Sequence, residues 1–357
     1  YNFGAISMKS AFQDTNYIID VNAPFLQANL HSTEPFSRFK NRILDKTVYS
    51  HWGDVFTQKS NSSDHSQDTT INKGRTEILI TTADITPVCE ILLPNLYISD
   101  NSTINFLYTP EDSLMLDIHS PAWGLGSTLL SNFKLDLDSP DSTIFCNITS
   151  DKVNLGGNLE IEQNLIKIIS DKGIIDFSYL FDNEKKNGNK LDFSSQIGLS
   201  RTDSGNIATT LGIDHSDLFI RGLEWHFTPS VVELSKKRFT FDNFSLQNKE
   251  QFVNIDGTIS SDPTDTISVA INRINLSFLD KLLKRGIDMH GIFSGQMYAC
   301  DLYGTPSILM DMDGDSISVL GQDGGSMKIM SKWDQERKRM NILAFNRHDG
   351  LTPLNIV

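Results

Sequence analysis

Apolar and polar residues alternate along most of the chain from about residue 76 onward. The run 133–138, Phe-Lys-Leu-Asp-Leu-Asp, alternates without interruption. Successive side chains of a β-strand point to opposite faces, so this pattern predicts strands with one apolar and one polar face. Separators rich in Gly, Asn, Asp, Ser and Pro, such as 183–188 and 261–263, predict tight turns. The sequence therefore predicts an all-β protein built as an antiparallel meander.

Two interruptions of the alternation carry further information about the sheet. The apolar parity of the segment ending at Ile271 changes before Ile274, and a second change falls between Phe241 and Phe244. One inserted residue that restores the apolar face is what a β-bulge provides, and bulges add twist and curvature. We therefore expect an elongated, curled meander, a β-groove, with one or two short helices.

Only two segments carry a helical pattern. Residues 35–44 predict a short amphipathic helix, and residues 277–285 predict another, which ends before Gly286. The remainder of residues 1–75 is expected to be irregular, with a polar linker over 57–74.

Composition and charge restrict the possible partners. Of 357 residues, 45 are acidic and 31 basic, which gives a formal net charge of −14. Such a surface repels phosphate backbones, so we expect no nucleic-acid partner. Cys89, Cys146 and Cys300 are far apart and form no C-x-x-C motif, which disfavours a disulfide framework or a zinc site. No stretch is long and apolar enough to predict a transmembrane helix.

The residues that catalysis would require do not form a recognisable set. Nucleophile-elbow, zinc-protease, Walker A and dinucleotide motifs are missing, and the eight histidines are dispersed along the chain. The run 311–315, Asp-Met-Asp-Gly-Asp, resembles the start of a calcium loop, but its sixth position is Ser316 and its twelfth is Gln322. An Asp-Gly hairpin turn is the favoured interpretation of this run. We therefore expect no enzymatic activity, no cofactor and no metal.

The C-terminal third carries a pattern that resembles a known family. Residues 255–265 read I-x-G-x-I-S-x-D-P-x-D, followed by Asn-Leu at 275–276, the predicted helix and G-x-x-x-G at 291–295. Together with WHFTP at 225–229 and SKWD at 331–334, this order resembles the C-terminal region of TamB proteins of the translocation and assembly module, in particular the Bacteroidetes type.

The resemblance implies a bacterial envelope protein related to the AsmA-like, bridge-like lipid-transfer proteins. Such a protein has an inner-membrane anchor, a β-groove across the Gram-negative periplasm and a C-terminus near an outer-membrane Omp85-type barrel. Its implied functions are carriage of phospholipid acyl chains and assistance to outer-membrane protein assembly. This chain, which contains no anchor, would be a section of the groove. We expect the irregular segment 1–75, a groove section over 76–220 and a TamB-like groove section over 221–357.

Apolar residues at strand spacing provide a candidate lining for the lipid. They are Leu135, Leu137, Val253, Ile255, Ile259, Ile267, Val269 and Ile271. Two other classes of protein remain open on the sequence. One is a structural or adhesive cell-surface protein whose apolar faces are closed in sandwich domains, because such strands alternate in the same way. The other is a carbohydrate-active β-helix enzyme, against which the irregular strand spacing counts.

Overall fold

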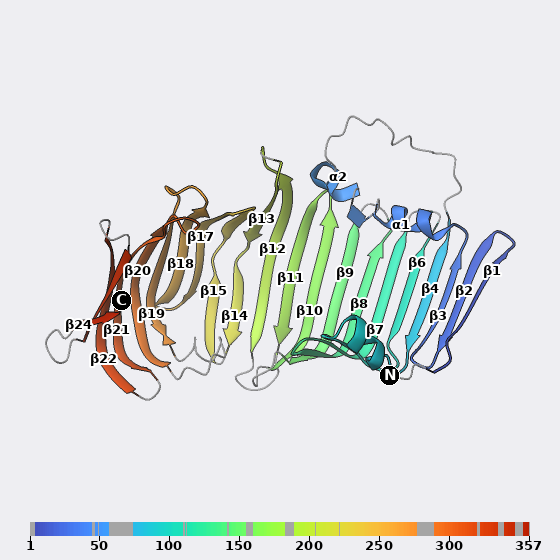
Figure 1. Ribbon diagram of the computed structural model, residues 1–357, viewed down its shortest axis with the longest axis horizontal. Coiled ribbons are helices and arrows are strands. Elements are labelled where there is room, and N and C mark those ends of the chain that lie inside the picture. Colours follow the sequence, from blue (N-terminus) through green and yellow to red (C-terminus); the bar gives the residue numbers. More distant parts are fainter. Residues whose placement is uncertain are drawn as a thin grey trace. The chain divides into compact units, whose positions relative to one another are not determined.

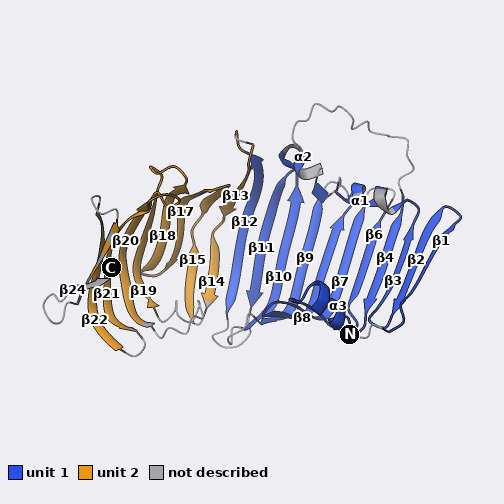
Figure 2. Cartoon of the chain, viewed as in Figure 1, with its two compact units in different colours: residues 1–201 blue, residues 202–357 orange. Residues whose placement is uncertain are grey.

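The computed structural model divides into two compact units, residues 1–201 and 202–357 (Figure 2). The structure describes the chain except for the following residues: 1–3, 45–46, 49, 57–73, 110, 112, 141–142, 155–159, 183–188, 204, 221, 277–288, 320–321, 335–338, 347–352 and 357. The predicted linker over 57–74 lies almost entirely outside the described residues, and the predicted helix over 277–285 lies fully outside them.

The first unit is an antiparallel meander whose strands lie side by side (Figure 1). Strands β1–β4 and β6–β12 each pair with their neighbours in that order, and the short β5 pairs with the far end of β7. The strands are β1 (Ser7–Gln13), β2 (Asn16–Ala23), β3 (Leu26–Ser32), β4 (Thr76–Thr82), β5 (Leu96–Ile98), β6 (Thr103–Tyr108), β7 (Leu114–Leu125), β8 (Thr128–Ser139), β9 (Ile144–Asn154), β10 (Glu160–Asp171), β11 (Ile174–Asp182) and β12 (Lys190–Arg201).

The second unit is also antiparallel, and one hairpin is inserted into its meander. Strands β16 to β24 pair consecutively, β13 pairs with β16, and the β14–β15 hairpin joins the second half of β17. The strands are β13 (Ile207–Ile213), β14 (Ser216–Ile220), β15 (Leu223–Phe227), β16 (Ser230–Ser235), β17 (Arg238–Asn248), β18 (Gln251–Ser260), β19 (Thr266–Asn275), β20 (Met289–Cys300), β21 (Ser307–Val319), β22 (Gln322–Asp334), β23 (Arg339–Asn346) and β24 (Pro353–Ile356).

The predicted all-β class is thus confirmed, and so are both predicted bulges. The register of β17 against β18 shifts between Phe241 and Phe244, and that of β19 against β20 shifts between Ile271 and Ile274. At each shift a single residue, Asn243 or Arg273, has a positive φ near 50° (54° and 52°), the left-handed conformation that accommodates the extra residue.

Three short helices lie in the described part of the first unit: α1 (Phe36–Leu44), α2 (Ser50–Phe56) and α3 (Thr86–Leu92). Helix α1 confirms the helix that was predicted over residues 35–44. Helix α2 is held at the ends of later strands, because Trp52 Nε1 donates a hydrogen bond of 2.8 Å to the Gly173 carbonyl and Arg201 donates to the Val55 carbonyl.

Several local predictions were wrong. Residues 7–32 form strands rather than an irregular segment, because backbone pairing to β4 continues the sheet where alternation is weak. Helix α3 was not predicted: it ends at Leu92, and after it only the three residues of β5 are extended. Asp313 and Gly314 lie inside β21, where the register shifts beyond Gly314, so they form a bulge site and not a hairpin turn.

No helix in the described part of the chain is long and apolar enough to cross a membrane.

Candidate functional site

A continuous apolar row crosses the first unit through the predicted lining residue Leu135. Leu135 is paired with Ile118 on β7 and with Ile148 on β9. Followed through the registers, the row takes one residue from every strand of the unit except β5: Met8, Val21, Ala28, Ile80, Ile104, Ile118, Leu135, Ile148, Ile166, Tyr179 and Phe193. We call the face that carries this row the apolar face of unit 1.

A second row on the same face passes through Leu137. Its partners are Leu116 on β7 and Cys146 on β9. Leu135 and Leu137 are half-buried rather than buried, and so are Ile118 and Ile148, the partners of Leu135. An apolar layer packed beneath a second sheet would be buried almost completely, so half-burial indicates that this part of the face is incompletely covered.

Helix α1 covers one end of the apolar face. Phe39 is 5 % exposed and forms a cluster with Tyr108 and Leu114, the last residue of β6 and the first of β7. The Phe39 and Phe106 rings meet edge to face at 5.3 Å. Leu137 also packs against this cluster, so the lining residue nearest the strand ends adjoins the group of side chains that anchors the helix.

The other six predicted lining residues lie together on one face of the second unit. Val253 is paired with Ile271, Ile255 with Val269, and Gly257 with Ile267. Ile259 shares this parity and is paired with Phe239. Val253 and Ile271 pack against a buried pair, Trp225 and Ile274. We call this the apolar face of unit 2; at Ile255 and Val269 it is half-buried, as in unit 1.

Gly257 shows why this face lacks one side chain. Its φ is +103°, and a Cβ atom there would collide with the carbonyl oxygen of Thr266 on the paired strand. The absence of a side chain at this position is therefore required for the close approach of the two backbones.

The opposite face of unit 1 contains a cavity that the sequence did not reveal. Its volume is about 530 Å³, within the range of small-molecule pockets. Its residues are Asn29, His31, Glu77, Ile78, Leu79, Asn105, Phe106, Leu107, Met115 and Asp117. The only available signal was the presence of Leu79, Leu107 and Met115 at positions where the alternation calls for polar residues.

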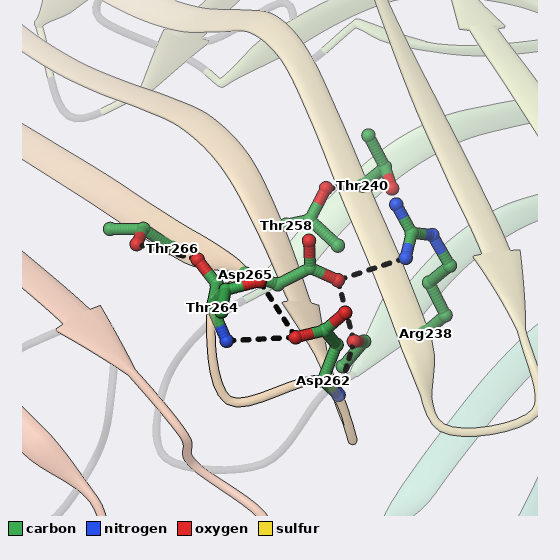
Figure 3. A network of polar contacts seen from close by, with 8 residues as sticks. Arg238, Thr240, Thr258, Asp262, Thr264, Asp265 and Thr266 are labelled. Carbon is green, nitrogen blue, oxygen red and sulfur yellow. Dashed lines mark hydrogen bonds and ion pairs between the residues drawn. The ribbon is translucent and has the colours of Figure 1, made fainter.

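The Asp-rich part of the TamB-like motif has a structural explanation. The Asp262 carboxylate accepts hydrogen bonds from the backbone N–H and the hydroxyl of Thr264, at 2.9 and 2.7 Å (Figure 3). These hydrogen bonds lower the pKa of Asp262. Asp265 accepts from Ser260 at 2.6 Å and forms an ion pair with Arg238 at 2.8 Å. The two carboxylates thus cap the β18–β19 turn and tie it to β17.

Two of the three cysteines, Cys89 and Cys146, are buried thiols. Cys146 lies buried in the second apolar row, and burial raises the pKa of its thiol, an effect strengthened by the negative charge of Asp136. Burial likewise raises the pKa of the Cys89 thiol on α3. A raised pKa keeps a thiol protonated and unreactive at neutral pH.

Comparison of the chain with protein-family models, with curated proteins and with solved structures found no match. The class that the observations define is therefore an antiparallel β-meander protein with half-buried apolar faces.

Proposed function

We propose that this chain is a section of a TamB-like protein that carries phospholipid acyl chains on the apolar faces of its two units. In this proposal the chain works in the periplasm of a Gram-negative bacterium, between an inner-membrane anchor and an Omp85-type barrel, and also assists outer-membrane protein assembly. It acts by binding and carriage, without catalysis.

The observation that carries the proposal is the uninterrupted apolar row through Leu135. From Val21 to Ile166 the row consists of half-buried aliphatic side chains on successive paired strands, and no residue of the whole row is charged. An apolar surface of this extent is costly to leave in water, and an acyl chain would cover it. Each buried methylene contributes roughly 0.8 kcal/mol, so one chain provides several kcal/mol before ordering costs.

The charged residues on the opposite face of each unit also favour binding of lipid on the apolar face. Asp136 and Asp117 are paired on the face opposite Leu135, and Asp256 lies opposite Ile255 in parity. Because an acyl chain would have to desolvate these carboxylates, it is expected on the apolar side alone.

The test is photo-crosslinking in cells with a photoreactive amino acid at Ile255, at Leu135, and at the matched neighbours Asp256 and Asp136. We expect phospholipid adducts from Ile255 and Leu135 and none from the two aspartate positions. Mass spectrometry of the purified chain should also detect co-purified phospholipid.

Equal labelling from both faces, or no lipid in either measurement, would contradict the proposal. A structural all-β protein would then be the better assignment. The β-helix enzyme is disfavoured already, because every strand pairing between described residues is antiparallel, whereas the coils of a β-helix are paired in parallel.

A further inference from the structure

The β14–β15 hairpin brings together two histidines and an aspartate that are separated in the sequence. Asp217 on β14 is paired with His226 on β15, so their side chains leave the hairpin on the same face. His215 lies two residues before Asp217 and shares its parity. A nitrogen of each imidazole and a carboxylate oxygen lie within 4.8 Å of one another.

The distances within this cluster suit a single metal ion. His226 Nδ1 is 2.6 Å and His215 Nε2 is 3.5 Å from the same oxygen, Asp217 Oδ1. Ligands bound to a tetrahedral Zn²⁺ at about 2.0–2.1 Å are separated from one another by about 3.3 Å. The two separations from Asp217 bracket that value, and the two imidazole nitrogens lie within 4.8 Å of each other, so side-chain rotations would bring all three ligands onto one ion. The two imidazole rings are already nearly parallel, at an interplanar angle of 11°.

The backbone under the cluster is fixed. Trp225 is 3 % exposed and packs with Leu218 on the other face of the hairpin, against Ile274 and Val253. His226 itself is paired with Gln247 of β17. The cluster therefore lies on the face opposite the apolar face of unit 2 and is independent of the proposed lipid site.

We propose that His215, Asp217 and His226 bind one divalent transition-metal ion of the Zn²⁺ class. Two imidazoles and one carboxylate are ligands that such ions prefer, whereas Mg²⁺ and Ca²⁺ prefer all-oxygen sites. Asp217 is 52 % exposed and His215 65 %, so the remaining coordination position is open to water. The ion clips β14 to β15 and stabilises the hairpin.

Calorimetric titration with Zn²⁺, on the full chain without a polyhistidine tag and after chelator treatment, tests the site. We expect one bound equivalent, at least about tenfold weaker binding in His226→Gln, and binding unchanged in His119→Gln. His119 is a fair control because it is an exposed histidine on another strand, with Asn132 as its partner at 3.1 Å. Mg²⁺ should not bind at the same concentrations.

Thermal unfolding provides a second readout. Zn²⁺ should raise the Tm of the wild type and of His119→Gln, and leave that of His226→Gln unchanged. If His226→Gln does not fold, the exposed His215→Gln takes its place. Equal Zn²⁺ affinity in the ligand variant and in His119→Gln, the absence of saturable binding, or equal binding of Mg²⁺ would overturn the proposal.

Discussion

Single residues on β18 show how parity controls the environment of a side chain. Ile255 is half-buried on the apolar face of unit 2, whereas its neighbour Asn254 is exposed and accepts a hydrogen bond of 2.6 Å from Ser245. The two positions are adjacent in the sequence, and their side chains point to opposite sides of the sheet. A charge introduced at each position therefore measures the difference between the two faces.

We expect Ile255→Asp to lower the free energy of unfolding by about 2–3 kcal/mol, because it moves a carboxylate into an apolar surface. Asn254→Asp should change it by no more than about 0.5 kcal/mol, because an oxygen remains to accept the bond from Ser245. Chemical denaturation followed by fluorescence compares the two. Similar losses in both variants would mean that the faces are assigned wrongly.

The backbone of Gly257 supports a second prediction at this scale. Gly257→Ala should destabilise the protein by about 1–3 kcal/mol, because alanine must adopt a positive φ and its Cβ meets the carbonyl of Thr266. Gly198→Ala is the matched control, since a Cβ there has nothing within 4 Å. Denaturant unfolding of both variants decides the matter; an unaffected Gly257→Ala would refute the close backbone approach.

At the scale of elements, α1 depends on the sheet for its stability. A helix of nine residues is too short to persist alone in water, so its packing through Phe39 must hold it. Phe39→Ala removes a buried ring, a change that costs about 3–5 kcal/mol at core sites. We expect faster amide exchange throughout α1, measured by hydrogen–deuterium exchange. Arg38 is the exposed neighbour of Phe39, so the amides of α1 in Arg38→Ala should exchange as in the wild type. Equal exchange rates in the two variants would mean that Phe39 does not anchor the helix.

The β18–β19 turn should respond to acid. The pKa of Asp262 is lower in the folded protein than in an unfolded chain, so its carboxylate stabilises the fold above its ordinary pKa of about 3.9. That contribution is lost as the pH falls through the lowered value. The stability difference between wild type and Asp262→Asn should thus be constant near neutral pH and shrink below about pH 4. Urea unfolding across this range measures it, and parallel curves at all pH values would exclude the effect.

At the scale of the whole molecule, the net charge of −14 determines which partners can approach. We expect no binding of duplex DNA or RNA at physiological salt, because the excess of acidic over basic residues repels phosphate backbones. Fluorescence anisotropy of a labelled duplex tests this. Saturable binding that weakens steeply with salt would indicate a basic patch that the overall charge conceals.

The sequence by itself determined the properties that depend on the backbone of one strand. Alternation at a period of two follows from the pleat, so it revealed most of the strands after residue 76, the face of Leu135 and of Ile255, and both bulges. The helix at 36–44 could also be predicted, because the helical period of 3.6 residues is likewise a property of a single segment of the chain.

Only the tertiary structure decided which residues become neighbours through strand pairing and register. His215 and His226 are eleven positions apart and become neighbours through the β14–β15 hairpin, so no spacing rule applied to the sequence would pair them. The cavity on the opposite face of unit 1 gathers two or three residues from each of four strands. Strand β1 forms because β2 pairs with it, although every residue of β1 is exposed. Contacts between strands depend on turn lengths and on register, and a sequence records those only indirectly.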